Sequence, residues 1–474
     1  MKRTYKLAAV AAAALALAGC AAPNMQAALG EANGLAGPVA GGAKAELRLD
    51  ASQREEAGKL AADLLSKPLT IDGAAQLALA NSPAFQAALA QSWGELAAAR
   101  QRGLPGGILF SFERLREGPE LEIGRLLSFG LFDLITLPQR RVVSGIESEQ
   151  ARVRMAGAIV DQVASARQAW VRAVAARQVE TYAVQVKEAA EASAELARRM
   201  QQVGNFNKLQ AARQQLFYAD ATSRLASARQ ETVSTREALV RQLGLSDEQA
   251  RALKLPERLP ELPKAPKGPD EIASALASQR LDARLARLEL EAAGQSRGVD
   301  LAASLVDAEL GVRHDTNFDG AGGRSNKSGF ELGIRLPLFD WGSTRRASLD
   351  ARALAAVNRY EAVARSASSQ VRESYSAYRT TFDQARHQRD EMVPLRKTIS
   401  EENQLRYNGM QIGVFELLAD AREQVSGVIG AIEAQRDFWL ADASLSSTLI
   451  GRPSMATSAS APAAGAAPAA QAGH

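Results

Sequence analysis

The residues of this 474-residue chain that could carry chemistry are one cysteine, three histidines and a few spaced carboxylates. Because Cys20 is the only cysteine, a disulfide framework and any site built from several thiolates are excluded. His314, His387 and His474 belong to no partner motif. The sequence therefore supports no catalytic residue and no metal site, and we expect neither an enzyme nor a protein with a cofactor.

Two short segments imitate ligand-binding loops. Asp315 begins a run that resembles the start of a calcium loop, but the twelfth position is Asn326 where such loops need a bidentate glutamate. The glycines of residues 320–323 lack the Gly-Lys-Ser/Thr that completes a phosphate loop. We interpret both segments as one loop between two strands.

Cys20 follows an export signal. Residues 2–6 contain three basic side chains, and the apolar run over residues 7–18 is too short to span a bilayer as a mature helix. The end of this run, Leu17-Ala18-Gly19-Cys20, resembles a bacterial lipobox, in which the cysteine is acylated. An ordinary signal peptide with a chance cysteine is the alternative.

This pattern predicts a lipoprotein signal peptide over residues 1–19 and an acylated N-terminal linker over residues 20–68. Ala21 stands where similar lipoproteins retained at the inner membrane have aspartate. The outer membrane of a Gram-negative bacterium is therefore the expected location, with the chain lipid-anchored and extending into the periplasm.

Composition favours long helices and argues against a nucleic-acid partner. Hydrophobic residues make up 46% of the chain and aromatic residues only 5%, and alanine is the most prominent apolar residue. Without the three basic residues of the leader, 54 basic and 53 acidic side chains remain. Beyond Cys20 no apolar run is long enough for a membrane helix, so any crossing of a membrane must use strands closed into a barrel.

The chain is built from two similar halves. Residues Gln202, Gly204, Phe206, Leu209, Ala212, Arg213 and Gln215 recur, identical, 209 positions later. A period of this length indicates a duplicated domain-sized unit. The repeats are predicted at 69–245 and 269–452, separated by a Pro-rich linker over 246–268 and followed by a disordered Ala/Pro tail over 453–474.

Each half is predicted to contain a helix, two strands, a long helix, a turn and a return helix. Heptad-like spacing predicts coiled-coil packing of the long helices, and Pro394 should kink or interrupt the second one. The elements expected in the first half are 70–102, 105–115, 119–132, 141–200 and 207–244. Those expected in the second half are 269–299, 304–314, 328–339, 343–404 and 414–450.

The strand segments of the second half alternate strictly between apolar and polar residues, as strands with one apolar and one polar face do. In a membrane barrel the polar positions would face the lumen, which predicts lumen positions for Glu309, Arg313, Glu331 and Arg335. A half-buried soluble hairpin explains the alternation equally well. Four strands cannot close a barrel, since small barrels begin at about eight, and a trimer with twelve strands is the smallest symmetric solution with a usable lumen.

The order of elements behind a lipobox resembles the TolC family of outer-membrane efflux channels over about residues 69–452. The segment from Leu405 to Arg422 is similar to the family's turn signature, and residues 200–213 are its counterpart. Leu69-Thr70 with Ala78 to Pro83 resembles the family's opening helix, and residues 336–342 the end of its last barrel strand.

The resemblance implies a mainly α protein with a membrane β-barrel part. It implies a homotrimer with a twelve-stranded barrel in outer-membrane lipid and a long periplasmic α-helical coiled-coil barrel. The family's partners are a periplasmic adaptor (membrane fusion) protein and an inner-membrane efflux pump. These partners would dock at the helical turns, which places Gly204, Asn205, Tyr407, Gly409 and Gly413 at the docking tip, with glycine permitting the reversal of the backbone.

Family members narrow the tip with acidic side chains just after this turn. Glu416 falls at such a position and Asp420 lies one helical turn later on the same face, so the two are candidate gate residues. A solvated helical surface is the alternative. Two departures leave the locking of the tip open: Ile412 stands where relatives have a basic residue, and the glycine is Gly409 rather than the next residue.

The sequence thus predicts an outer-membrane channel of a tripartite efflux system that passively conducts substrates across the periplasm and the outer membrane. The competing interpretation is a lipid-anchored periplasmic helical scaffold without a pore. The sequence does not identify the cargo, the pump or the adaptor.

Overall fold

The computed structural model describes residues 24–269, 280–305, 307–319, 322–335 and 342–452. The chain divides into two compact units, described separately below. Unit 1 comprises residues 1–32, 88–156 and 281–366, and unit 2 comprises residues 33–87, 157–280 and 367–474. Cys20, the signal peptide, the tail and the predicted strand end at 336–339 lie outside the described residues.

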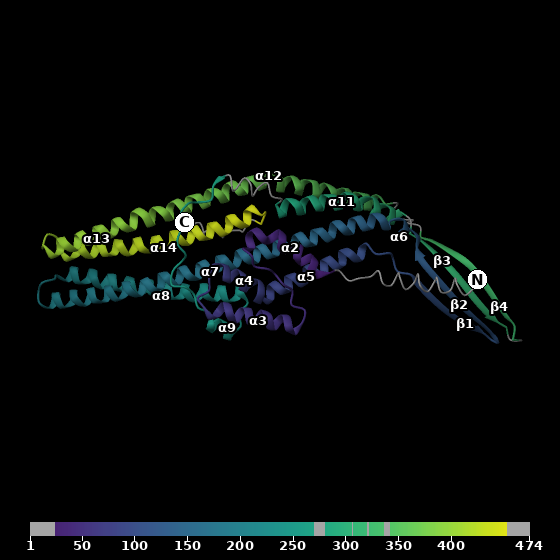
Figure 1. Cartoon of the computed structure of the whole chain (residues 1–474), viewed down its shortest axis with the longest axis horizontal. Helices are drawn as coiled ribbons and strands as arrows, with labels where there is room; N and C mark the ends of the chain where they lie inside the picture. Colours follow the sequence, from purple (N-terminus) through teal and green to yellow (C-terminus); the bar gives the residue numbers. More distant parts are fainter. Residues whose placement is uncertain (1–23, 270–279, 306, 320–321, 336–341, 453–474) are drawn as a thin grey trace, which may run out of the picture. The chain divides into compact units, whose positions relative to one another are not determined.

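Unit 1 contains one antiparallel sheet with the strand order β1-β2-β3-β4 (Figure 1). The strands are β1 (Leu109–Glu117), β2 (Glu120–Gly130), β3 (Asp307–Phe318) and β4 (Arg324–Arg335). The two hairpins come from different halves of the sequence, and β2 pairs with β3 so that Phe129 lies opposite Leu310. All four predicted strands are therefore present, and they form a single sheet.

Helices lead into and out of this sheet. In unit 1 the described helical segments include α5 (Pro83–Arg102), α6 (Leu131–Ile135), α11 (Leu281–Leu305) and the beginnings of α7 (Leu137–Gln202) and α12 (Ser343–His387). Gln150 on α7 donates to the Leu288 carbonyl oxygen on α11 over 3.0 Å, and Arg284 pairs with Glu149. Polar contacts thus join a helix of the first half to a helix of the second.

Unit 2 contains the long antiparallel helices. Helix α7 continues to Gln202 and returns as α8 (Lys208–Leu243), which is followed by α9 (Asp247–Ala252). In the second half α12 passes into a π-helical turn, η1 (Gln388–Met392), then into α13 (Val393–Asn408) and α14 (Val414–Leu449). The predicted interruption at Pro394 is confirmed, because proline stands in the first turn of α13 directly after the π-helical turn.

The N-terminal region is more regular than the sequence indicated. The segment predicted as an N-terminal linker over residues 20–68 contains α2 (Met25–Ala40) and α3 (Ala51–Ser66). Asp50 caps α3 by accepting a hydrogen bond from the Gln53 amide over 2.8 Å. The predicted helix over 70–102 is two helices, α4 (Ile71–Asn81) and α5, because Pro83 supplies no N–H and α4 ends before it.

The main core of unit 2 packs small and branched side chains around Trp170, which is 1% exposed. The Trp170 indole N–H donates to the Leu69 carbonyl oxygen over 2.8 Å, so the tryptophan needs no water partner. A second cluster gathers Tyr378, Phe382 and Phe438, with ring centroids 5.6 Å apart in both pairs that include Phe438. Among the described residues no helix has the length and apolarity required to cross a bilayer.

The Pro-rich segment between the halves is an anchored strap (residues 255–267). Arg177 on α7 donates to the Leu255 carbonyl oxygen over 2.6 Å. On the other side, Gln435 and Trp439 of α14 both donate to the Pro260 carbonyl oxygen, over 2.6 and 3.1 Å. The strap joins the two halves covalently as part of the chain. It also links α7 of the first half to α14 of the second through hydrogen bonds to its backbone carbonyls.

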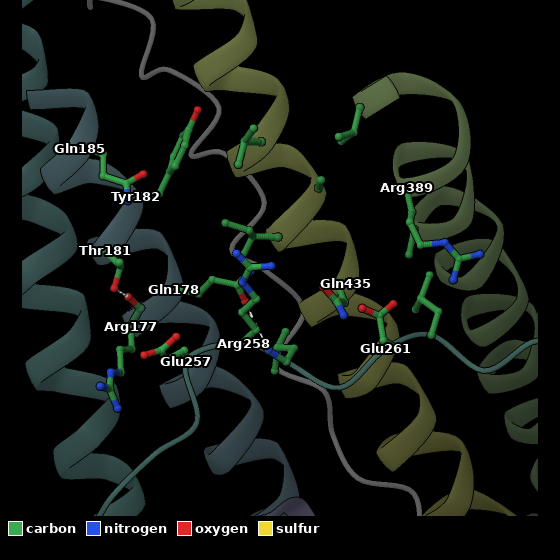
Figure 2. A pocket seen from close by; sticks show the side chains of 17 residues that line it. Arg177, Gln178, Thr181, Tyr182, Gln185, Glu257, Arg258, Glu261, Arg389 and Gln435 are labelled. Carbon is green, nitrogen blue, oxygen red and sulfur yellow. Dashed lines mark hydrogen bonds between the residues drawn. The ribbon is translucent and has the colours of Figure 1, made fainter. Parts of the chain in front are cut away.

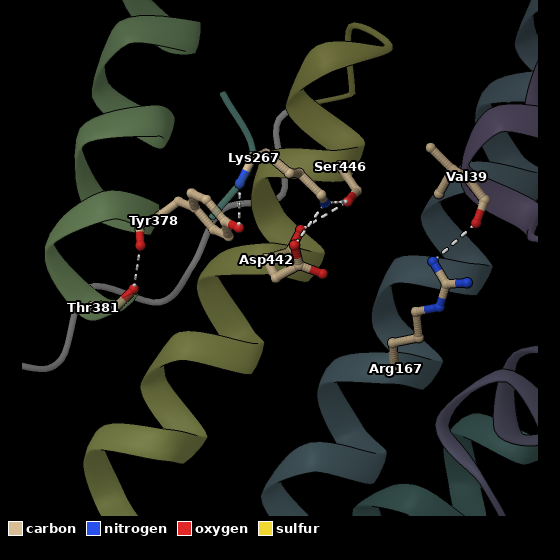
Figure 3. A network of polar contacts seen from close by, with 7 residues as sticks. All are labelled: Val39, Arg167, Lys267, Tyr378, Thr381, Asp442 and Ser446. Atoms are coloured by element: carbon tan, nitrogen blue, oxygen red, sulfur yellow. Dashed lines mark hydrogen bonds and ion pairs between the residues drawn. The ribbon is translucent and has the colours of Figure 1, made fainter. Parts of the chain in front are cut away.

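The C-terminal end of the strap is fixed by Lys267 (Figure 3). The Lys267 amide donates to the Tyr378 hydroxyl over 3.1 Å, and the Lys267 ammonium lies 2.6 Å from a carboxylate oxygen of Asp442. Burial raises the pKa of the Tyr378 hydroxyl, against which the Lys267 backbone hydrogen bond acts in the lowering direction. The hydroxyl thus stays neutral at physiological pH and remains an acceptor for the strap.

Replacing Tyr378 by phenylalanine should destabilise the protein by about 1 kcal/mol, because the Lys267 amide loses its acceptor. Since the pKa of Tyr378 is raised in the folded state, the unfolded chain loses this proton first. The advantage of the wild type over Tyr378→Phe should therefore be complete below pH ~10 and shrink as the pH rises further.

Thermal unfolding in detergent checks both statements. The control is Tyr360→Phe, since the half-exposed Tyr360 lies on the same helix and makes no hydrogen bond through its hydroxyl within the described residues. Equal melting temperatures for Tyr378→Phe, Tyr360→Phe and the wild type would contradict the assignment of Tyr378 as an anchor of the strap.

Candidate functional site: the two faces of the sheet and the helical turns

The register of the sheet separates the residues into an apolar and a polar face. On the apolar face Phe110, Leu127, Val312 and Phe330 form one row across all four strands. All four of these large side chains are exposed, and Phe330 is 83% exposed. A monomer that exposes such a continuous surface indicates a membrane or protein contact there.

The polar face contains a cluster of ionic contacts around Arg313. The Arg313 guanidinium lies 2.9 Å from Asp315 on the same strand, 3.5 Å from Glu113 on β1 and 3.9 Å from Glu331 on β4. Arg313 thus reaches a carboxylate across the intervening strand β2. One guanidinium facing three carboxylates leaves this part of the face negatively charged.

Gly124 on β2 makes this contact between β1 and β3 possible. It pairs with Glu113 on one side and Asp315 on the other. A Cβ atom at Gly124 would lie 3.3 Å from an Asp315 carboxylate oxygen and 3.4 Å from the Glu113 Cβ. The missing side chain therefore leaves the space in which the charged groups of β1 and β3 meet.

The four predicted lumen residues take polar-face register positions. Glu309 lies opposite Gly333, Glu331 opposite Gly311, and Arg335 opposite Asp307. Sequence reasoning missed Glu113 and Asp315 as partners of Arg313. The alternation of the strands places both on the polar face, but only the register reveals that they meet.

In the turn between α7 and α8, Gly204 reverses the backbone as predicted, and an N-cap that was not predicted follows it. Gly204 has φ +83°, and its amide and the next one donate back to the carbonyls of Gln201 and Met200 over 3.1 and 2.8 Å. Asn205 lies within this turn, but Asn207 caps α8 through a reciprocal pair of hydrogen bonds with Gln210. The Asn-x-x-Gln spacing at 207–210 is the sequence signal that could have identified it.

The second turn differs from the expectation. Gly409 has φ −81°, whereas Met410 has φ +57° and is 94% exposed. Gly413 is the N-cap of α14 and lacks a side-chain cap, and Tyr407 accepts the Met410 amide through its carbonyl over 3.0 Å. The prediction that glycine provides the backbone reversal is correct at Gly204 and wrong at Gly409.

The number of residues that separates equivalent backbone positions of the two turns therefore differs from the number that separates identical residues in the sequence. Gly204 and Met410 occupy the same left-handed position, as Asn207 and Gly413 occupy the same capping position, so the structural lag is 206 residues. The sequence identities run at 209. As a result Gly204 and Gly413, identical in sequence, have different backbone roles.

Glu416 and Asp420 lie in the first two turns of α14, and their environments differ. Glu416 is exposed, whereas Asp420 is partly buried and its Oδ2 atom has no hydrogen-bond partner among the described residues. Nearby, the Arg422 guanidinium lies 4.3 Å from the Phe217 ring centroid and donates to the Arg213 carbonyl oxygen over 3.3 Å. A covered carboxylate oxygen is costly unless water or another group donates a hydrogen bond to it.

A cavity of about 770 Å³ lies between α7, the strap, η1 and α14 (Figure 2). Arg258 of the strap points into it, and burial raises the pKa of the Tyr182 hydroxyl at its side. Three arginines (Arg177, Arg258 and Arg389) and two glutamates (Glu257 and Glu261) line it, so the charges of the lining largely offset one another with an excess of one positive charge. No group of residues suited to a metal ion occurs in the described ranges.

Gly124→Val should destabilise the sheet by roughly 1–3 kcal/mol, because the new side chain enters the space between Glu113 and Asp315. Gly329→Val is the matched control, since Gly329 lies on the same face and has open space at its Cβ position. Thermal unfolding in detergent should separate the two variants, and equal effects would contradict the proposed role of Gly124.

The two turns should respond differently to alanine. Gly204→Ala should cost about 1 kcal/mol because of its positive φ, whereas Gly409→Ala should be nearly neutral. Met410→Gly should stabilise the chain by a similar amount, since glycine adopts φ +57° without strain. Melting temperatures of the three variants provide the check, and a larger loss for Gly409→Ala than for Gly204→Ala would refute this account of the turns.

Comparison with known proteins agrees with the architecture. Residues 272–427 match the family model described as outer membrane efflux protein. The outer membrane protein VceC from Vibrio cholerae has a similar fold, with a TM-score of 0.66 and 16% identity over 80% of this chain and 96% of that chain. For the CmeC outer membrane channel of Campylobacter jejuni the TM-score is 0.65, with 14% identity over 85% of this chain and 87% of that chain.

The MtrE outer membrane channel of Neisseria gonorrhoeae is similar as well, with a TM-score of 0.63 and 19% identity over 81% of this chain and 89% of that chain. A search of curated protein sequences gave no match. The resemblance predicted from the sequence is confirmed in two respects: residues 272–427 match the outer membrane efflux protein family, and the chain has the fold of the outer-membrane channels CmeC, VceC and MtrE.

Proposed function

We propose that the chain is the outer-membrane channel of a tripartite efflux system. In this role it conducts substrates passively from an inner-membrane pump and a periplasmic adaptor protein through the periplasm and the outer membrane. The family and the fold support an outer-membrane efflux channel. The cargo and the partner proteins are not specified by either.

The observation that carries this proposal is the four-stranded sheet with two unpaired edges. Within the described residues the outer strands β1 and β4 each pair with one neighbour only, so one side of each has no strand partner there. In a bilayer such groups cost several kcal/mol each, and a barrel closed by further copies satisfies them. Three copies of this sheet give the twelve strands of the proposed homotrimer.

The faces of the sheet support the same arrangement. The exposed apolar row with Phe330 would contact outer-membrane lipid, and the polar face with Arg313, Glu309, Glu331 and Arg335 would line the lumen. Acylation at Cys20 would add an anchor to the same membrane.

The helical turns are the proposed contact with the adaptor. Exposed apolar side chains gather near both turns: Val203 is 71% exposed, Leu209 61%, Leu405 63% and Met410 94%. Such side chains at a helix end favour docking of another protein. The docking tip would comprise Gly204, Asn205, Tyr407, Gly409 and Gly413.

Glu416 and Asp420 are the proposed gate. In a trimer with α14 facing the axis, three copies of each would form rings of negative charge that attract cations and repel one another. The unpartnered Oδ2 atom of Asp420 is consistent with an acceptor whose donor comes from outside the described chain.

Planar bilayer recordings distinguish this function from a helical scaffold without a pore. The purified, acylated protein should migrate as a heat-resistant trimer and produce ion channels. A stable oligomer that never conducts would favour the scaffold.

Glu416→Ala combined with Asp420→Ala should raise the single-channel conductance and weaken the block by multivalent cations, because both rings lose their charge. Glu433→Ala is the control, since Glu433 is an exposed carboxylate on a different side of α14. Unchanged conductance and block in the double variant would remove Glu416 and Asp420 from the gate.

A further inference from the structure

The acidic and basic residues of the sheet are distributed unequally between its two faces. Every aspartate and glutamate of the four strands takes a register position on the polar face. The apolar face has no carboxylate position, and it has four arginine positions: Arg114, Arg116, Arg125 and Arg324. We call these four residues the arginine belt.

The belt lies in one half of the sheet. Arg116, Leu121, Phe318 and Arg324 form the row next to the hairpin turns, and Arg114 and Arg125 belong to the next two rows. Toward the helices, the rows with Phe330 and Leu332 are apolar at every described position. The apolar face thus changes from purely apolar near the helices to cationic near the turns, the end that points away from the helices of unit 1 (Figure 1).

The side chains of the belt have no anionic partner in the described chain. Arg114, Arg116 and Arg324 are exposed, Arg125 is half-buried, and none of the four forms a side-chain hydrogen bond or ion pair there. The Arg324 guanidinium lies 5.8 Å from the Phe318 ring centroid, which is a contact with an aromatic ring and not with an anion. Arg313 on the polar face, by contrast, faces three carboxylates.

The length of the strands places the belt at the level of lipid headgroups. The 12 residues of β3 extend roughly 40 Å at about 3.3 Å per residue. Even with the tilt of barrel strands, this exceeds an apolar band of about 25 Å. A guanidinium on the lipid-facing side is costly within hydrocarbon, and beyond the band it meets phosphates, which it binds with two parallel hydrogen bonds.

We propose that the arginine belt binds the phosphate groups of outer-leaflet lipids. The inference rests on the proposed function, since it requires the sheet to lie in the outer membrane. The proposed ligand is a lipid because the arginine belt continues the exposed apolar face. A phosphorylated lipid can place its acyl chains against Phe110, Val312 and Phe330 and its phosphates against the arginines nearer the hairpin turns. Each bound lipid would bridge cationic positions on neighbouring strands.

The test uses the full-length protein in neutral phosphatidylcholine nanodiscs. Thermal dissociation of the oligomer is measured after addition of lipid A or of lipid A from which both phosphates have been removed. Lipid A should raise the dissociation temperature by several degrees, dephosphorylated lipid A should not, and high salt should reduce the difference. Equal effects of the two lipids would overturn the proposal, and this comparison requires no variant.

A second measurement assigns the effect to the belt. Arg114→Gln combined with Arg116→Gln and Arg324→Gln should lose most of the stabilisation by lipid A. Arg224→Gln, at an exposed arginine of α8, should retain it. Retention of the full effect in the triple variant would also overturn the proposal. Channel formation by the wild-type protein in planar bilayers is recorded separately. If the wild-type protein conducts ions but is stabilised by neither lipid, the lipid-binding role of the arginine belt is refuted and the proposed function is not. If it does not conduct ions, the proposed function is refuted.

Discussion

The structure depends on one constraint, the pairing of strand edges. The ladder between β2 and β3 joins hairpins that are separated by nearly 180 residues of chain and brings both halves of the duplication into one sheet. It also leaves β1 and β4 as edges, with a continuous apolar face between them. In water such a sheet leaves its apolar face exposed, and in lipid it leaves the backbone groups of both edges without partners. Closure with further copies pairs the edges, and the bilayer then covers the apolar face.

Much of the fold follows from periodicity, which a single sequence displays. The period of two identifies the strands of the second half, and the lag of 209 residues reveals the duplication that gives their counterparts in the first half. Heptad-like spacing and Pro394 predict the long helices and the site of their interruption. What could not be predicted rests on contacts between distant residues: the strap becomes an ordered element only because donors such as Arg177 and Gln435 meet its carbonyls.

The candidate site likewise combines features that the sequence predicts with contacts that only the structure reveals. The alternation of the strands gives the polar face, but the convergence of Glu113, Asp315 and Glu331 on Arg313 depends on the register and on the space above Gly124. At the second turn, glycine content suggested Gly409 as the left-handed residue, and the helix instead continues until Met410 takes that conformation. Composition indicates that a turn is present, whereas the hydrogen bonds of the preceding helix decide which residue reverses the chain.

The pairing of β1 with β4 of another copy is tested most directly by cysteine cross-linking in native membranes. Because Cys20 is the only natural cysteine, a cysteine at Ser111 on β1 can be combined in turn with one at Ser325, Lys327 or Gly329 on the same face of β4. The account predicts that oxidation of one of these double variants yields a covalent trimer and no larger species. Absence of a cross-link in every register, or a ladder of ever larger oligomers, would contradict a closed ring of three sheets.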